Sequence, residues 1–410
     1  MELINSILWG RFTIALILLC GIYHTVKSGF VQLRFARHLK CAGRSGFRSV
    51  MSSLAASMGT GNITGCAAAI AAGGAGAVFW MWISAFLGMA LAYRENRLGG
   101  EYAEKYRDAS KGPMLYIEKG TGSKKLALVY AAACLAAALA MGCMSQTSAM
   151  AEAAENIKIP PLAVSVIAAI AAGAVIFSSN KAAVSAMSAA EKLVPLMGLL
   201  YVSGCTALII MSGSSLTELL GRIISEAFTF EAASGGILGT EVSKAVSIGL
   251  RRGIFSNEAG MGSSVLVHTE GKFGSPEEMG CWAAFEVFLD TIVCCTLTAL
   301  AIMSTGKDTL SDAFSLYFGE YGGGFVFLCV CLFAWAAVLG WCCYGEKCLD
   351  YLTGGRKSTV PYKVIFCLCA AFAGLFPSEL LFGLSDIINV FLILPNLLAI
   401  TILTMTDKKS

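Results

Sequence analysis

The chain has 410 residues and a formal net charge of +3, with 56% hydrophobic and only 14% charged residues. Soluble globular domains carry about 25% charged residues, so this composition excludes an ordinary soluble domain. The small net charge also gives no reason to expect a nucleic-acid partner. Glycine is abundant (44 residues) and proline scarce (8 residues), which favours close helix packing and helix breaks in a bilayer over loops.

Hydrophobic segments long enough to span a bilayer need about 17 to 25 residues. In chain order, such segments occur at 7–26, 47–71, 76–97, 126–150, 161–178, 193–212, 223–250, 280–303, 324–345, 362–377 and 387–405. The first has no basic segment before it and a strongly basic one directly after it. We therefore expect a retained helix there and not a cleaved signal peptide.

The distribution of Lys and Arg predicts how these eleven segments are oriented. With the N-terminus outside and the spans alternating, 26 of the 30 basic residues fall on the cytoplasmic side. The four that remain outside are Arg11, Lys158, Arg222 and Lys307. Basic residues favour cytoplasmic loops, so the sequence predicts an N-out, C-in protein.

The second segment is interrupted by the run Met58-Gly59-Thr60-Gly61-Asn62-Ile63-Thr64-Gly65. Glycine costs about 1 kcal/mol against alanine in a helix interior, and a freed backbone group in hydrocarbon needs a partner. Such a run suits a helix that is unwound around a small polar guest, with free N–H and C=O groups to bind it.

A second glycine-rich run, residues 232–239, interrupts the seventh segment. The two interrupted segments are five spans apart and therefore run in opposite directions through the membrane. Corresponding broken helices in two inverted halves point to a transport site. The alternative is a pair of small-residue surfaces for helix packing.

Several motifs follow one another in an order typical of one family. They are LAASMGTGNITGCAAAIAAGGAGAVFWMW at residues 54–82, then residues 112–114, 116–120, 191–195, RGIFSNEAGMGS at 252–263, 340–341 and 344–348. Nearly end to end, the chain resembles the alanine:cation (sodium:alanine) symporter family of bacteria and archaea.

The resemblance implies an all-α polytopic membrane protein with a LeuT-type fold, ten helices in two inverted five-helix repeats preceded by an extra helix. The expected divisions are an accessory helix and basic linker (1–46), the first repeat (47–212), the second repeat (213–405) and a cytoplasmic tail (406–410). The protein would lie in the prokaryotic plasma membrane, with the lipid bilayer around it and without an obligatory protein partner.

A neutral amino acid needs donors for its carboxylate and acceptors for its ammonium. The N–H groups of Thr60 and Gly61 can meet the carboxylate without a basic side chain. The run at 233–236 would bring carbonyls to the ammonium. Gln146 matches a glutamine of the family that faces the pocket, and it is a candidate to bind the ammonium or the carboxylate. An interhelical hydrogen bond is the alternative role for Gln146. Further candidates for binding or lining the pocket are Phe230, Ala233, Ser234, Gly235, Gly236, Trp335 and Trp341.

Sodium is the cation that the resemblance implies, and oxygen atoms are its expected ligands. By resemblance to LeuT-type sites, the Asn62 side chain and the Ser57 carbonyl would hold one ion. A second would lie between the carbonyls of Ala55 and Met58 and the segment 324–345, where Ala334 offers a carbonyl.

Four positions depart from the family pattern. Ala336 and Ala337 stand where hydroxyl residues are common, which removes the expected side-chain ligands of the second cation. Trp335 replaces a phenylalanine and reshapes the pocket. Ala75 replaces a proline, from which we expect an effect on loop stiffness and not on chemistry.

Ionisable groups inside a membrane are functional candidates. Glu286 and Asp290 are four residues apart and share a helix face, so one of them could hold a proton or support a cation. For Asp290 we favour a structural hydrogen-bonding role. Glu95 and Glu258 lie near cytoplasmic ends, with Arg251 and Arg252 close to Glu258, and we expect salt bridges of gates or loops there.

The function that follows is import of alanine, glycine or serine with sodium. The same substrate carried with protons, and an amino-acid sensor without flux, remain as alternatives. An enzyme is not expected. The chain has no HExxH or GxSxG motif, its histidines are only His24, His38 and His268, and its sixteen cysteines are scattered along apolar segments.

Overall fold

The structure is a computed structural model, which describes residues 2–39, 44–155, 157–178, 182–228, 240–355 and 359–406. These residues form helices and their connections, without a strand. The elements before residue 140 are α1 (Glu2–Leu8), α2 (Arg11–Lys27), η1 (Val31–Leu33), α3 (Phe35–His38), α4 (Arg44–Ser57), η2 (Thr60–Asn62), α5 (Thr64–Gly73), α6 (Gly76–Tyr106), α7 (Pro113–Thr121) and α8 (Lys124–Leu139). Those that follow are η3 (Ala140–Ser145), α9 (Gln146–Glu155), α10 (Pro161–Ile176), α11 (Ala182–Ser212), α12 (Leu216–Phe228), α13 (Thr240–Asn257), α14 (Val265–His268), α15 (Pro276–Val287), η4 (Phe288–Cys295), α16 (Thr296–Thr305), α17 (Leu310–Phe318), α18 (Glu320–Thr353), α19 (Val360–Phe372), η5 (Ala373–Leu375) and α20 (Ser378–Thr406).

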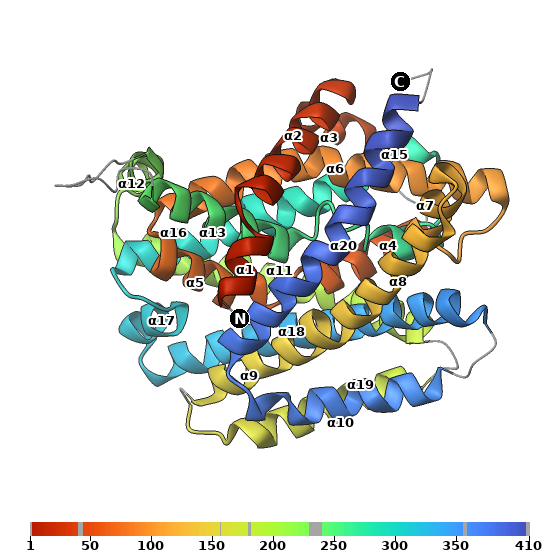
Figure 1. The fold of residues 1–410 in the computed structure, drawn as a ribbon. Helices are drawn as coiled ribbons and strands as arrows, with labels where there is room; N and C mark the ends of the chain where they lie inside the picture. The colour runs from red at the N-terminus through yellow and green to blue at the C-terminus, as the bar shows by residue number, and fades with distance from the viewer. Residues whose placement is uncertain are drawn as a thin grey trace.

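Long helices run through the molecule (Figure 1). The helices α6, α18, α20 and the continuous pair α8–α9 form the long rods. The helices α10 and α19 pack side by side along one edge. α12 and α17 lie at one end of the rods, and α7 lies at the other.

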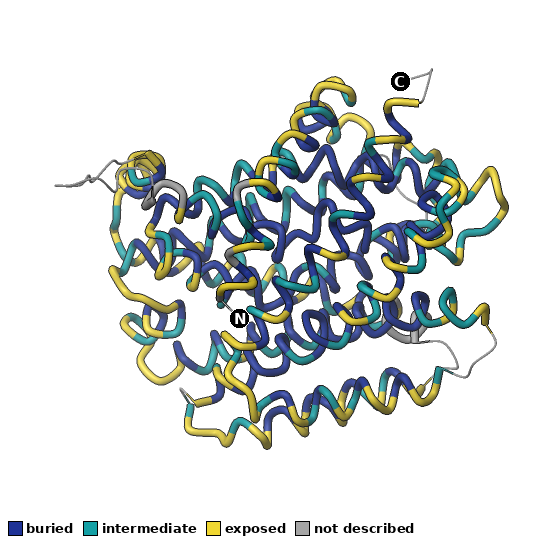
Figure 2. The backbone as a smooth tube through the Cα atoms, in the orientation of Figure 1, coloured by how far each residue is buried: buried dark blue, intermediate teal, exposed yellow. Residues whose placement is uncertain are grey.

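The surface of these helices is apolar, as expected for contact with lipid. Figure 2 shows buried backbone through the centre and exposed positions along the outer faces. On α11, Leu199 and Ile210 are 71% and 73% exposed. Large apolar side chains that remain exposed over several helices mark a surface that meets hydrocarbon and not water.

Six described helices are long and apolar enough to cross a membrane. They are Gly76–Tyr106, Lys124–Glu155, Ser188–Ser212, Pro276–Thr305, Glu320–Thr353 and Ser378–Thr406. Shorter apolar helices occupy Phe12–Lys27, Pro161–Ile176 and Val360–Leu375. Each expected span other than 223–250 overlaps a helix or an interrupted helix at the same place in the chain.

The span expected at 223–250, with a break at 232–239, overlaps two described helices. α12 ends at Phe228 and α13 begins at Thr240 and continues to Asn257. α12 has exposed apolar residues on one face, such as Leu216 and Ile224, and packs against α6 with the other. The break expected at 232–239 falls between these two helices and lies outside the described residues.

Two long helices contain a π-helical turn, η3 between α8 and α9 and η4 between α15 and α16. At η3, the indole of Trp341 on α18 fills the space beside Gly142. A Cβ atom at Gly142 would lie 2.0 Å from Trp341 Cγ. The absence of a side chain at 142 therefore fixes how closely α18 approaches this turn.

We expect Gly142→Ala to destabilise the protein by about 1–3 kcal/mol, because the buried indole must move to accept the methyl group. Gly198→Ala on α11 is the matched control. A Cβ atom there meets nothing within 4 Å, so we expect no loss and a gain of up to about 1 kcal/mol. Thermal unfolding of both variants in detergent measures the difference, and equal unfolding temperatures would contradict the packing argument.

Ala75, where the family pattern has a proline, has a role beyond loop stiffness. Its backbone N–H donates to Glu226 Oε2 on α12 over 2.9 Å. A proline has no N–H group and could not make this bond. The N–H group at position 75 thus ties α12 to the loop between α5 and α6.

Candidate functional site

The first predicted break lies where we expected it. α4 ends at Ser57, and a single 3₁₀ turn, η2, separates it from α5. The N–H of Gly59 donates to the Ser57 carbonyl over 2.7 Å, and that of Asn62 donates to the Gly59 carbonyl over 3.3 Å. The carbonyls of Ala55 and Met58 are therefore released from the helical hydrogen-bond pattern, in which those N–H groups would have bound them.

Gln146, the first residue of α9, lies against the break in the first interrupted helix. Its Oε1 atom accepts from the Thr60 backbone N–H at 2.8 Å and from the Thr60 hydroxyl at 2.9 Å. Both residues are buried. An amide oxygen thus binds the Thr60 N–H group, one of the two donors that we expect to receive a substrate carboxylate, so the structure brings together two of the predicted site residues.

Asn62 lies in a buried polar cluster with Asp290 and Ser256. Its Nδ2 donates to Asp290 Oδ1 at 2.7 Å and to the Asp290 carbonyl at 3.0 Å. The Ser256 hydroxyl lies 2.6 Å from Asp290 Oδ2 and 3.3 Å from Asn62 Oδ1. Thr291 donates to the same carboxylate at 2.9 Å. Asp290 therefore has the hydrogen-bonding role that we favoured, and it holds Asn62 in a fixed orientation.

A second irregular segment, residues 258–264, separates α13 from α14. Glu258, Gly260 and Gly262 adopt φ angles of +56°, +89° and +72°. The end of α13 that leads into this segment packs against the first break. A Cβ atom at Gly61 would lie 3.1 Å from Phe255 Cδ1 and 3.3 Å from the Ser256 Cα atom. Two interrupted helices therefore meet at their interruptions.

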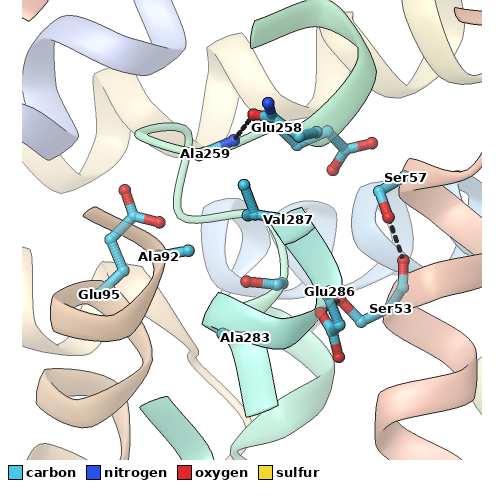
Figure 3. Close-up of a pocket in the computed structure, with 11 residues that line it drawn as sticks. Ser53, Ser57, Ala92, Glu95, Glu258, Ala259, Ala283, Glu286 and Val287 are labelled. Atoms are coloured by element: carbon cyan, nitrogen blue, oxygen red, sulfur yellow. Dashed lines mark hydrogen bonds between the residues drawn. The ribbon is translucent and has the colours of Figure 1, made fainter. Parts of the chain in front are cut away.

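Beside the two interruptions is a small cavity. Figure 3 shows carboxylates from three elements around it: Glu95 from α6, Glu258 from the irregular segment and Glu286 from α15. Ser53 and Ser57 line it from α4. The three carboxyl groups are buried, and each accepts a hydrogen bond from at least one neighbouring side chain.

The salt bridges expected for Glu95 and Glu258 are wrong. Glu95 Oε1 accepts from Asn396 Nδ2 at 2.6 Å, and Glu258 accepts from Ser263 and Trp341. The two arginines pair instead with Asp386 on α20, at 3.8 Å for Arg251 and 3.1 Å for Arg252. Sequence proximity suggested the other pairing, but the side chains at this end of α13 point toward α20.

The predicted residues of α18 divide between two environments. The Trp341 indole N–H donates to Glu258 Oε1 at 2.9 Å, which fixes the ring beside the second irregular segment. Ala334 is buried, and the indole N–H of Trp335 is buried and lacks a hydrogen-bond partner among the described residues. The remaining candidates, Phe230, Ala233, Ser234, Gly235 and Gly236, lie outside the described residues.

Gln146→Glu should lower the affinity for an amino acid by at least about tenfold, since a permanent carboxylate would hold the two Thr60 donors more tightly than an amide. Gln146→Met, of similar length without charge or polar atoms, separates the added charge from the loss of the amide. The apparent KM of uptake for each variant is the measurement. An unchanged KM in Gln146→Glu would remove Thr60 and Gln146 from the binding site.

A profile of the sodium:alanine symporter family matches residues 1–410. The chain belongs to this family. Among relatives, the sodium/alanine symporter AgcS of Methanococcus maripaludis is 34% identical over 98% of this chain and 93% of its own length. The "Probable sodium/glutamine symporter GlnT" of Bacillus subtilis is 31% identical over 98% of this chain and 87% of its own.

Solved structures show the same fold at low sequence identity. MhsT in complex with L-phenylalanine matches with a TM-score of 0.58 and 16% identity, over 88% of each chain. A manganese transporter of Eremococcus coleocola also gives 0.58 and 16%, over 88% of this chain and 78% of its own. These are LeuT-type transporters. This member of the sodium:alanine symporter family is thus an integral membrane transporter and not an enzyme.

Two features of the site in this symporter-family protein were missed by sequence reasoning. The first is the irregular segment 258–264, whose motif SNEAGMGS helped to identify the family. Its pair of glycines, Gly260 and Gly262, just after a polar helix end was a usable signal for a break. The second is the contact of His268 with Glu286, 2.8 Å apart, for which a sequence without an alignment offers no signal.

Proposed function

We propose that the protein imports a small neutral amino acid together with sodium across the prokaryotic cell membrane by alternating access. Alanine is the first candidate substrate, and glycine and serine are the others. The observation that carries this proposal is the first break, where freed backbone groups and the Thr60 donors meet Gln146 in a buried site. Membership of the sodium:alanine symporter family supports it.

The substrate carboxylate would replace the Gln146 oxygen on the N–H and hydroxyl groups of Thr60. Gly61 would provide a second N–H in η2, just before α5 begins, and the dipole at that end of α5 favours an anion. No Lys or Arg lies in the break itself, which favours a zwitterion over a phosphate or a dicarboxylate. The indole N–H of Trp335 would be a further donor, while Trp341 and the residues 230 and 233–236 would line the pocket.

Sodium would bind to oxygen atoms that the break releases. One ion would take the Asn62 side-chain oxygen and the Ser57 carbonyl, and a second would take the carbonyls of Ala55, Met58 and Ala334. The close approach of α18 to α4 favours the second position, since a Cβ atom at Gly340 would lie 2.9 Å from Ala56 Cα. Ala336 and Ala337 are buried without hydroxyl groups, so backbone carbonyls alone would complete this site.

The proposed topology has eleven membrane-spanning helices, N-out and C-in. The five-helix repeats would occupy 47–212 and 213–405, after the accessory segment 1–46 and before the tail 406–410. The basic residues of the loops support the orientation. The contact between α4–η2–α5 and α13–α14 at their interruptions supports the inverted repeat, because corresponding helices of such repeats cross at the transport site.

Uptake of radiolabelled alanine into proteoliposomes tests the proposal, with an imposed sodium gradient compared with an imposed proton gradient. Accumulation that depends on sodium is the expected result. Competition by glycine, serine and glutamine then defines the side-chain size that the pocket accepts, which matters because the names of relatives include both alanine and glutamine.

Proton-driven accumulation without sodium would instead support a proton-coupled carrier. Binding of alanine without net flux under either gradient would support a sensor. Absence of both binding and flux, in protein shown to be folded, would contradict the proposed substrate class.

A further inference from the structure

His268, the last residue of α14, is fully buried and lies between two hydrogen-bonding partners. Its Nδ1 is 2.9 Å from Asn96 Oδ1 on α6, and its Nε2 is 2.8 Å from Glu286 Oε1 on α15. The second oxygen of Glu286 accepts from the Ser53 hydroxyl of α4 at 2.7 Å. One imidazole and one carboxyl group thus link four helices at the wall of the cavity.

The neighbours of Asn96 determine which atom carries hydrogen. Its Nδ2 lies 2.9 Å from the Ala92 carbonyl and 2.8 Å from the Ser264 hydroxyl. The reversed amide would place an oxygen against the Ala92 carbonyl oxygen, and two acceptors repel each other at that distance. Asn96 therefore presents its oxygen to His268, so His268 Nδ1 must carry the hydrogen.

One further proton must then lie between His268 Nε2 and Glu286 Oε1. The pair is either an imidazolium beside a carboxylate or a neutral imidazole that accepts from a carboxylic acid. Both descriptions contain the same number of protons. Without that proton, a nitrogen lone pair would face a carboxylate oxygen at 2.8 Å, so this packing of α14 against α15 requires the proton.

The other titratable groups around the pair do not supply an alternative neutralising charge. Glu95 and Glu258 line the same cavity and are bound to Asn396, Ser263 and Trp341. On α18, Tyr344 lies near the pair. The Lys347 ammonium donates to the Leu266 carbonyl and forms an ion pair with Glu270 over 2.9 Å. Asp290, one turn beyond Glu286, is bound to Asn62, Ser256 and Thr291. From α3, Phe35 packs on the opposite side of α15 against Phe285 and Phe288.

The His268–Glu286 pair connects the two interrupted helices on the same side of both interruptions. Ser53 precedes the first break by five residues, and His268 follows the second irregular segment on α14. Glu286 bridges these two residues from a third helix. Opening the cavity in this direction would separate His268 or Ser53 from Glu286, and in the proposed orientation this is the direction of the cytoplasm.

We propose that Glu286 and His268 form a binding site for one proton, occupied while α14 packs against α4 and α15 and emptied to the cytoplasm when this contact opens. The direction of release rests on the proposed function and topology, whereas the proton count rests on the hydrogen bonds alone. A low cytoplasmic pH fills the site and holds the cytoplasmic side closed. A high cytoplasmic pH empties it and favours release of the amino acid.

Glu286→Gln is the decisive variant, since the amide donates to His268 Nε2 and accepts from Ser53 as the occupied pair does, with no proton to lose. Infrared difference spectra of the purified wild-type protein, titrated between about pH 5 and 9, should show a carboxyl or imidazole change that Glu286→Gln lacks. Glu95→Gln, a carboxyl change in the same cavity, should retain that signal. His268→Gln is a second variant that removes the shared proton from the other side.

In proteoliposomes with a fixed sodium gradient, alanine exchange by the wild-type protein should rise as the internal pH rises. Exchange by Glu286→Gln should be slower by about tenfold at high internal pH and independent of that pH. Glu95→Gln should keep the dependence on internal pH, whatever its absolute rate.

Identical infrared titrations of wild type and Glu286→Gln, or loss of the same signal in Glu95→Gln, would overturn the proposal. An infrared signal assigned to the pair in a protein that neither binds nor moves alanine would uphold the proton site and reject the proposed substrate. Alanine exchange that keeps its dependence on internal pH in Glu286→Gln would reject the site and leave the transport function standing.

Discussion

Asn62→Leu is expected to abolish sodium-dependent uptake of amino acid. The substitution removes the side-chain oxygen proposed as a sodium ligand. It also removes the two hydrogen bonds that Asn62 makes with Asp290 over 2.7 and 3.0 Å. A buried carboxylate that loses such a donor costs about 1–3 kcal/mol, so the unfolding temperature should fall while the protein still folds.

Thr64→Val is the matched control for Asn62→Leu. Thr64 lies two residues further along, and its hydroxyl donates only to the Thr60 carbonyl at 3.0 Å. We expect its uptake to stay within about threefold of the wild type, because a neutral hydrogen bond contributes about 1 kcal/mol. Normal uptake by Asn62→Leu at normal abundance in the membrane would show that Asn62 has no role in the site.

Asp386→Ala is expected to have the largest effect on stability. The Asp386 carboxylate is 2% exposed and accepts from Arg252 at 3.1 Å, with Arg251 at 3.8 Å. Removal of one partner from a buried ion pair costs about 3–5 kcal/mol, since the remaining charge is left without compensation. The Arg252 guanidinium also packs over Phe255, which borders Gly61, so the loss should reach the first break and abolish uptake.

A partly exposed ion pair provides the comparison for Asp386→Ala. Asp108 lies 2.8 Å from Lys111 in the loop after α6. Asp108→Ala should cost less than about 1 kcal/mol. Thermal unfolding of both proteins in the same detergent measures the contrast, and equal shifts would mean that the pair at Asp386 is hydrated and not truly buried.

Much of this architecture follows from residue types alone. Apolar length places the long helices, and the run from Met58 to Gly65 predicts the unwound turn that the structure places at Thr60–Asn62. Glycine, threonine and asparagine are all poorer helix formers than alanine or leucine, so this prediction needed no knowledge of neighbouring residues. The resemblance to a family added Gln146, which contacts Thr60 directly.

Other features depend on contacts between distant residues and could not be predicted in this way. Asp386 forms ion pairs with the arginines of α13, although Arg252 is 134 residues away in the chain. From the sequence, those arginines could equally have paired with Glu258. The direction in which their side chains leave α13 decides between Glu258 and Asp386. The π-helical turns could not be predicted from residue types, because residues such as Ala140 and Met141 in η3 and Leu289 in η4 also suit an ordinary α-helix.

Each of those turns holds one residue more than an α-helical turn would. Gln146 directly follows η3 and contacts Thr60, and Asp290 lies within η4 and contacts Asn62. Deletion of one residue at 140–145 would let the backbone become a regular α-helix. It would also rotate the preceding and following stretches of the helix by about 100° relative to each other. The extra residue therefore allows the helix to keep its packing on both sides of the turn while a polar side chain points inward. A deletion there should strongly reduce transport and leave the helix content almost unchanged.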